Sequence, residues 1–215
     1  MTTKVKNWND YWFQGDELIR DFEGMYRDIE DPWLQLEKTF QPRLFVGLSL
    51  LQWTLRDDPS RKLEILDIGA GLGGPTKYLK PYGKVTASDI SETAIKKAAA
   101  LDPEIDWVVD DITRAREEWL ERFDIIWISE VLAIVITEID DVLKNVASYL
   151  KPDGHLIFNY YLPDNPWTSR YISGSRALFD KLSEHFNVEV FIDLNPFDGS
   201  QRELLGLLGK KSNEP

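Results

Sequence analysis

A short apolar run that ends in a glycine-dense turn is the feature that most constrains the fold of this chain. The run Leu63–Ile68 leads directly into Gly69, Gly71 and Gly74, which have the spacing G-x-G-x-x-G, and we expect a helix after this turn. Glycine is needed where a backbone turns sharply and a ligand must approach it without meeting a Cβ atom. Such turns lie at the carboxyl end of the first strand of α/β domains, where nucleotide-sized ligands bind. The spacing alone leaves three ligands open, which are NAD, a nucleotide phosphate and S-adenosylmethionine.

Strand and helix patterns alternate along the chain after this run. We expect further strands at 84–89, 105–109, 123–129, 155–160, 188–194 and 202–209, and helices at 92–101, 117–122, 140–150 and 176–185. Repeating β-α units of this length predict an α/β fold, a three-layer sandwich around a seven-stranded and mostly parallel sheet. The last two strands follow each other without a helix between them, so the final strand is expected to be antiparallel.

The first 60 residues differ in composition from residues 61–212, which we expect to form the ligand-binding core. These first 60 residues are rich in aromatic and acidic side chains. Pro32 follows Asp31 and predicts the start of a helix. Leucines at helical spacing across residues 41–55 predict an amphipathic helix against the sheet. The earlier aromatic residues predict either a lid over the ligand or a part of the core. We therefore expect one structural domain with an amino-terminal helical cap.

Composition excludes several classes of function. The formal net charge of −12 and the pI of about 4.7 disfavour nucleic acid as a partner, because such partners select a basic face. The chain has no cysteine, which excludes disulfides, thiolate-bound zinc and a cysteine nucleophile. It shows neither the apolar core of a signal peptide nor an apolar run long enough to cross a bilayer. We expect a cytoplasmic protein that is a monomer or a homodimer, with no membrane partner and no metal.

Two further features bear on which ligand the glycine turn holds. Asp89 lies about twenty residues after the turn, at the end of the second expected strand, where a carboxylate can accept both ribose hydroxyls. NAD sites and S-adenosylmethionine sites share this acid. The turn itself contains no lysine or arginine to cradle a phosphate. A sulfonium cofactor has no phosphate and needs no such cradle.

Four motifs in order along the chain resemble class I S-adenosylmethionine-dependent methyltransferases. They are LDIGAGLG at Leu66–Gly73, VVDDI at Val108–Ile112, FDIIWISEVL at Phe123–Leu132 and LKPDGHL at Leu150–Leu156. The resemblance covers about residues 63–211, including the final antiparallel strand. It implies an enzyme that takes its methyl group from S-adenosylmethionine and releases S-adenosylhomocysteine.

The resemblance also implies which residues bind the cofactor. They are Asp67, Gly69, Gly71, Asp89, Ile90, Asp111, Ile112 and Ser129. Asp67 is implied to organise the methionine amino group, and Asp89 to accept from the ribose. At the adenine end, Asp111 is favoured over Asp110 as the acceptor for the amino group, with the backbone N–H of Ile112 reaching a ring nitrogen.

A narrower resemblance is to the nodulation-type N-methyltransferases. It rests on Asp31-Pro32-Trp33, Phe40, Arg43 and Ser129-Glu130-Val131-Leu132. It implies that Trp33 and Arg43 help to hold the cofactor, whereas each could instead simply lie on a helix face. The residues that follow Leu132 are Ala133-Ile134, where those enzymes carry aromatic residues, so the acceptor is not implied.

On the side of the site where the methyl acceptor would bind, the sequence offers one charged candidate for a catalytic residue. Glu130 follows the fourth expected strand, where it could serve as a general base or instead bind the methionine amino group. Tyr160, Tyr161 and Trp167 follow the fifth strand and could line an acceptor pocket. We predict transfer of a methyl group to N or O of a small-molecule or sugar-like acceptor. The alternative is a module that binds the cofactor without catalysis.

Overall fold

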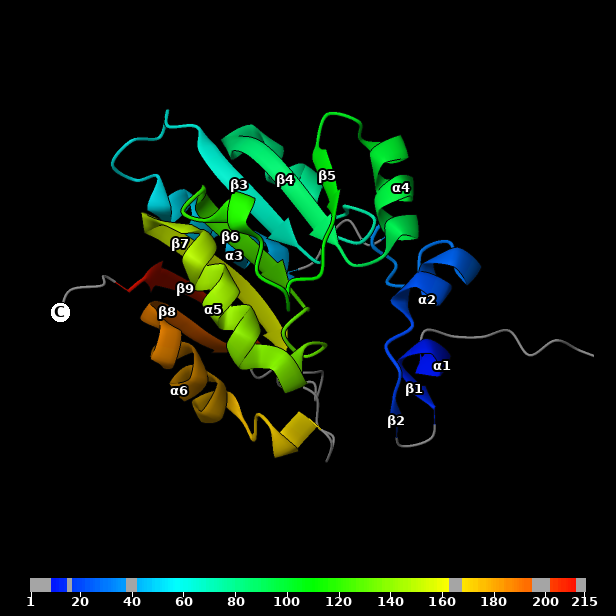
Figure 1. Ribbon diagram of the computed structural model, residues 1–215. Coiled ribbons are helices and arrows are strands. Elements are labelled where there is room, and N and C mark those ends of the chain that lie inside the picture. The colour runs from blue at the N-terminus through cyan, green and yellow to red at the C-terminus, as the bar shows by residue number, and fades with distance from the viewer. Residues whose placement is uncertain (1–8, 15–16, 38–41, 163–167, 195–201, 212–215) are drawn as a thin grey trace, which may run out of the picture.

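One seven-stranded sheet forms the centre of the protein, with the strand order β5-β4-β3-β6-β7-β9-β8 (Figure 1). The computed structural model describes residues 9–14, 17–37, 42–162, 168–194 and 202–211. The strands are β3 (Leu63–Ile68), β4 (Gly83–Asp89), β5 (Asp106–Val109), β6 (Phe123–Ser129), β7 (Leu150–Tyr161), β8 (Phe186–Leu194) and β9 (Glu203–Lys210). Neighbouring strands from β5 to β7 pair in parallel, while β9 pairs antiparallel with both β7 and β8. The predicted fold class is confirmed, including the antiparallel last strand.

Helices cover both faces of this sheet and complete three layers. Helices α5 (Ile139–Tyr149) and α6 (Ser175–His185) lie on one face, and α3 (Pro42–Thr54) lies on the other (Figure 1). Successive side chains of a strand point to opposite faces. Leu66 of β3 accordingly packs in the cluster that contains Val142 of α5, whereas Ile65 packs in the cluster that contains Leu51 of α3.

The segment between the glycine turn and β4 departs from the expected helix. It folds as two 3₁₀ turns, η1 (Thr76–Tyr78) and η2 (Lys80–Tyr82), although the sequence predicts that the turn leads into a helix. Pro81 lies inside this segment and has no backbone N–H for an α-helical hydrogen bond. The helix expected at 117–122 is likewise a single 3₁₀ turn, η3 (Glu117–Trp119). The helix expected to start at Pro32 is wrong, since residues 31–37 form turns in which the Asp31 carboxylate accepts from the amides of Gln35 and Leu36.

The amino-terminal segment packs beside helix α4 (Glu92–Leu101) at the carboxyl end of β4. It consists of α1 (Asn9–Trp12), the hairpin β1 (Phe13–Gln14) and β2 (Glu17–Leu18), and α2 (Phe22–Asp28). Figure 1 shows α2 alongside α4, away from α5 and α6. Met25 and Tyr26 form a small core with Leu72 of the glycine turn and Ala94 of α4. In the part of the chain that the structure describes, no helix is long and apolar enough to cross a membrane.

Candidate active site

The glycine turn has a backbone that only glycine adopts easily. Gly69, Gly71 and Gly73 have φ angles of 71°, 57° and 79°, in the left-handed region. The amides of Gly69 and Ala70 both donate to the carbonyl of Ser88, at 2.8 and 2.9 Å, which fastens the turn to the end of β4. A Cβ atom on Gly69 would lie 2.2 Å from Cγ2 of Val131, so the loop after β6 closes directly on the turn.

Two buried carboxylates stand beneath this turn. Asp89 ends β4, and its oxygens accept from the amides of Gly71 and Ser91, both at 2.9 Å. Asp67 accepts from the hydroxyl of Thr76 at 2.6 Å. Burial raises the pKa of Asp89 to about 6 and that of Asp67 to about 7, because desolvation disfavours the charged form. Asp89 is thereby bonded to the glycine turn and Asp67 to Thr76 just after it, while their contacts with the cofactor stay predictions.

The residues expected at the adenine end follow β4 and β5. Ile90 is exposed (53%) immediately after Asp89, while Ile112 is buried. Asp111 accepts from the backbone and the hydroxyl of Thr113, at 3.1 and 2.7 Å. Asp110 pairs with Arg116 at 3.1 Å, and its second oxygen is shielded from water without a hydrogen-bond partner. Which of the two aspartates contacts adenine stays a prediction.

The amino-terminal segment reaches the glycine turn through a residue that the sequence did not single out. Gln35 accepts from the amide of Leu72 at 2.7 Å and donates to the carbonyl of Ala70 at 3.3 Å. A Cβ atom on Gly71 would lie 2.5 Å from both the Gln35 side chain and the hydroxyl of Tyr26. A lone glutamine carries no motif, so only the fold reveals this contact.

Trp33 also belongs to this amino-terminal contact. Its side chain hydrogen-bonds to the buried Tyr26 hydroxyl, and its ring packs edge-on against Trp12, with centroids 6.4 Å apart. Trp33 thus lies two residues before Gln35, which contacts the glycine turn, while a direct contact of Trp33 with the cofactor stays a prediction. Phe40 and Trp167, which the sequence analysis also names, lie outside the described residues.

Glu130 leaves the end of β6 in a strained conformation. Its φ angle is 65°, which a non-glycine residue adopts only at a cost. The side chain of Asn159 on β7 holds it there, because its oxygen accepts from the amide of Glu130 at 2.8 Å and from the hydroxyl of Ser129 at 3.1 Å. Ser129 is thereby bound to a neighbouring strand, and its contact with the cofactor stays a prediction. Strain maintained at a strand end is typical of functional positions.

The Glu130 side chain is one-third exposed (33%), yet its Oε1 atom is shielded from water and has no hydrogen-bond partner. Burial raises the pKa of Glu130 to about 7, the Arg43 guanidinium lowers it, and the Glu203 carboxylate raises it. Arg43 lies 3.7 Å from Glu130 and 2.9 Å from Glu203. The structure therefore pairs Arg43 with these two acids, while its role in holding the cofactor stays a prediction.

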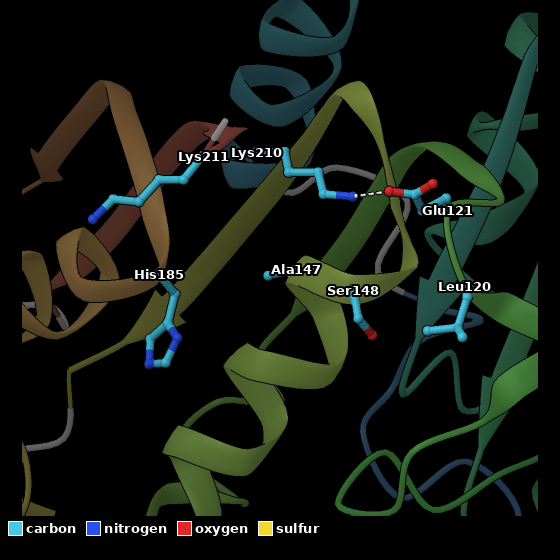
Figure 2. Close-up of a pocket in the computed structure, with 7 residues that line it drawn as sticks. All are labelled: Leu120, Glu121, Ala147, Ser148, His185, Lys210 and Lys211. Carbon is cyan, nitrogen blue, oxygen red and sulfur yellow. Dashed lines mark hydrogen bonds and ion pairs between the residues drawn. The ribbon is translucent and has the colours of Figure 1, made fainter. Parts of the chain in front are cut away.

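A separate cavity lies at the opposite end of the sheet. It has a volume of about 500 Å³ and is lined by Leu120, Glu121, Ala147, Ser148, His185, Lys210 and Lys211 (Figure 2). These residues surround the last residue of β9 and the first residue of β7, far along both strands from Glu203 and Tyr161. The cavity is not part of the site around the glycine turn.

Comparison with known proteins agrees with this geometry. Residues 66–156 match the model of a methyltransferase domain. Nodulation protein S of Rhizobium tropici is 27% identical over 194 residues, which cover 86% of this chain and 79% of that protein. The same protein of Sinorhizobium fredii (strain NBRC 101917 / NGR234) is 26% identical, covering 77% of this chain and 78% of that protein.

A solved structure has the same fold. N-methyltransferase NodS from Bradyrhizobium japonicum WM9, in complex with S-adenosylhomocysteine, superposes with a TM-score of 0.69 at 24% identity, covering 89% of this chain and 98% of that one. The matched domain, the sheet order and the glycine turn identify the chain as a class I S-adenosylmethionine-dependent methyltransferase. Within that class it is similar to the nodulation proteins S.

Proposed function

We propose that this enzyme transfers its methyl group to a nitrogen or oxygen atom of a small-molecule acceptor, and that Glu130 is the group that accepts the proton. One observation carries the proposal, which is that Glu130 follows β6 directly beside the glycine turn. Ile68 of β3 is in register with Ile128 of β6, so Gly69 and Ser129 lie at the same edge of the sheet. The contact of Val131 with Gly69 brings the two loops together.

The donor end of the proposed site uses the buried acids. Asp89 is placed to accept from ribose hydroxyls, and the exposed Ile90 offers an apolar surface to the adenine ring. The open backbone at Gly69 and Gly71 can follow the methionine portion closely, because no Cβ stands in its way. Gln35 holds the outer side of this turn, so the amino-terminal segment acts as its cap.

Glu130 suits proton transfer at neutral pH. When bound, the cofactor supplies an electrophilic methyl group on a positively charged sulfur. A protonated amine must lose a proton before its nitrogen can attack that carbon, and a hydroxyl must lose one before or during the attack; a positioned carboxylate can take this proton. A base is most effective when its pKa lies near the working pH, and burial raises the pKa of Glu130 to about 7. Most of the remaining rate gain comes from holding acceptor and donor in line.

The name of one relative favours nitrogen over oxygen as the atom that receives the methyl group. The bacterial protein whose solved structure is compared above is called an N-methyltransferase. The net charge of the site points the same way, since Glu130 and Glu203 together exceed the charge of Arg43 and would attract a cationic amine.

The proposal is tested with a methyl-labelled donor and a panel of small amines, amino sugars and alcohols. We expect label in at least one acceptor, and a fall of about 10²–10⁴-fold in turnover in Glu130→Gln with unchanged affinity for S-adenosylhomocysteine. Glu189→Gln, which removes a carboxylate paired with His155 at the other end of the sheet, is the matched control. Binding of S-adenosylhomocysteine without transfer to any acceptor of the panel would favour the non-catalytic module.

A further inference from the structure

Arg43 joins two carboxylates that lie far apart in the sequence. Its Nη1 atom lies 2.9 Å from Oε1 of Glu203, the first residue of β9, and its Nε atom lies 3.7 Å from Oε1 of Glu130. Glu203 thus makes a direct hydrogen bond to the guanidinium, whereas Glu130 lies just beyond hydrogen-bond distance. Arg43 comes from α3, so three elements meet at this point.

The same point holds buried polar atoms that make no hydrogen bond, although two of them form the 3.7 Å ion pair between Arg43 and Glu130. Nε of Arg43, Oε1 of Glu130 and the hydroxyl of Tyr160 are all shielded from water and make no hydrogen bond. Tyr160 is fully buried on β7, one residue before Tyr161, which is in register with Glu203. Unpaired buried polar groups are costly. Their concentration beside the proposed base indicates that the arrangement is maintained for its effect on that base.

Charge explains what the arrangement does. The groups that face Glu130 are Arg43 from α3, Glu203 from β9 and Tyr160 from β7. Arg43 favours the charged form of Glu130, and Glu203 disfavours it. The Tyr160 hydroxyl is neutral at physiological pH and adds no charge, since burial raises its already high pKa further, to about 12. If Arg43 were free of Glu203, it could shorten the 3.7 Å ion pair with Glu130 to hydrogen-bond distance.

We propose that Glu203 is a positioning residue that holds Arg43 back from Glu130 and thereby keeps Glu130 able to bind and release a proton near neutral pH. In this arrangement Arg43 acts through Glu130 and is not required to contact the cofactor. The inference rests on the proposed role of Glu130 as proton acceptor. Its own test, however, needs no acceptor and no turnover.

The experiment is a pH titration of glutamate side-chain carboxyl carbons by NMR on the full chain labelled with ¹³C-glutamate. The Glu130 signal is assigned by its loss in Glu130→Gln. We expect Glu203→Gln to lower the midpoint of Glu130 by about one pH unit, and Arg43→Gln to raise it by about the same amount. Arg43→Lys keeps the positive charge and should leave the midpoint near its wild-type value. Glu189→Gln, on the neighbouring strand β8, should change nothing.

Opposite shifts in the two charge-removing variants are the signature of this role, because a merely structural role would move the midpoint in one direction or abolish the folded spectrum. An unchanged midpoint in Glu203→Gln, with the other glutamate signals intact, overturns the inference. So does an equal shift in Glu189→Gln. If the shifts occur but Glu130→Gln retains full turnover, the electrostatic inference stands and the proposed catalytic role of Glu130 fails.

Discussion

Two acidic side chains, at the ends of the strands β4 and β6 that flank β3, have different surroundings and, as we propose, different tasks. Asp89 accepts hydrogen bonds from two backbone amides, whereas Oε1 of Glu130 accepts none. Backbone donors stabilise a carboxylate that must accept further hydrogen bonds, and a carboxylate without such donors is better suited to exchanging a proton. The local environment of each acid, more than its residue type, separates the donor end of the site from the acceptor end.

Replacement of Asp89 tests the donor end. We expect Asp89→Asn to weaken binding of S-adenosylhomocysteine by about 1–3 kcal/mol, because hydrogen bonds from the ribose to a charged group are lost. Isothermal titration calorimetry measures the change, with the exposed Asp153→Asn as control. Equal affinities in Asp89→Asn and the wild type would mean that the ribose lies elsewhere.

The affinity for S-adenosylhomocysteine should also depend on pH. Burial raises the pKa of Asp89 to about 6 in the free protein, and donating hydroxyls would favour its charged form in the complex. Binding should therefore release protons, and affinity should rise as pH increases from about 5 to about 7.5. Calorimetry in buffers of different ionisation enthalpy detects the protons. A loss of this dependence in Asp89→Asn assigns it to that residue, and its persistence there contradicts the assignment.

Docking of helix α3 on the sheet depends on a close approach. A Cβ atom on Gly47 would lie 2.4 Å from the ring of Trp127 on β6, which is buried in the core. Gly47→Ala gains about 1 kcal/mol in helix propensity, but overpacking costs about 1–3 kcal/mol. We expect a net loss of about 1 kcal/mol in the free energy of unfolding, measured in urea. Ser49→Ala, at an exposed position of the same helix, is the control, and a more stable Gly47→Ala would show that the ring moves aside freely.

One carboxylate hydrogen-bonds α2 to the start of α4, in addition to the apolar contacts between the two helices. Glu23 accepts from the hydroxyl of Ser91 at 2.7 Å and from the amide of Thr93 at 3.2 Å, as well as from the hydroxyl of Thr93. It thus caps the amino terminus of α4 from outside the helix. Hydrogen bonds from Ser91 and Thr93 lower the pKa of Glu23, so the contact is formed by the charged carboxylate.

Glu23→Ala should release the amino-terminal segment while leaving the sheet intact. We expect the free energy of unfolding to fall by about 1 kcal/mol. We also expect faster tryptic cleavage after Arg20 and Arg27, because local opening exposes these peptide bonds. Cleavage rates followed by mass spectrometry provide the measurement, and Glu37→Ala in the same segment is an exposed control. Cleavage spread evenly over the sheet region would instead indicate that Glu23 stabilises the whole fold.

At the scale of the whole molecule, the fold class and the position of the glycine turn could be predicted largely from local sequence. The strand Leu63–Ile68 is apolar and ends in glycines, and both signals are contained in a few residues. The contacts of Gln35 with Ala70 and of Arg43 with Glu203 span 35 and 160 residues. No local sequence pattern predicts such contacts, so the contact of Gln35 with the turn and the environment of Glu130 could be found only from the structure.

Ligand binding should stabilise the molecule as a whole. S-adenosylhomocysteine at about 100 times its dissociation constant adds about 2.7 kcal/mol to the free energy of unfolding. For a chain of this length we expect Tm to rise by about 5–10 °C in differential scanning fluorimetry. NADH at the same concentration should leave Tm unchanged. A rise in Tm with NADH but not with S-adenosylhomocysteine would favour the alternative that the glycine turn is a dinucleotide site.

The measurement that tests the central claim most directly is a crystal structure of the enzyme with S-adenosylhomocysteine bound. We expect the ribose hydroxyls within hydrogen-bond distance of Asp89 and the methionine portion along Gly69 and Gly71. The sulfur atom should face the side of the site that holds Glu130. Product bound away from the glycine turn, for example in the cavity beside Lys210, would contradict it. So would a ribose that contacts no carboxylate of β4.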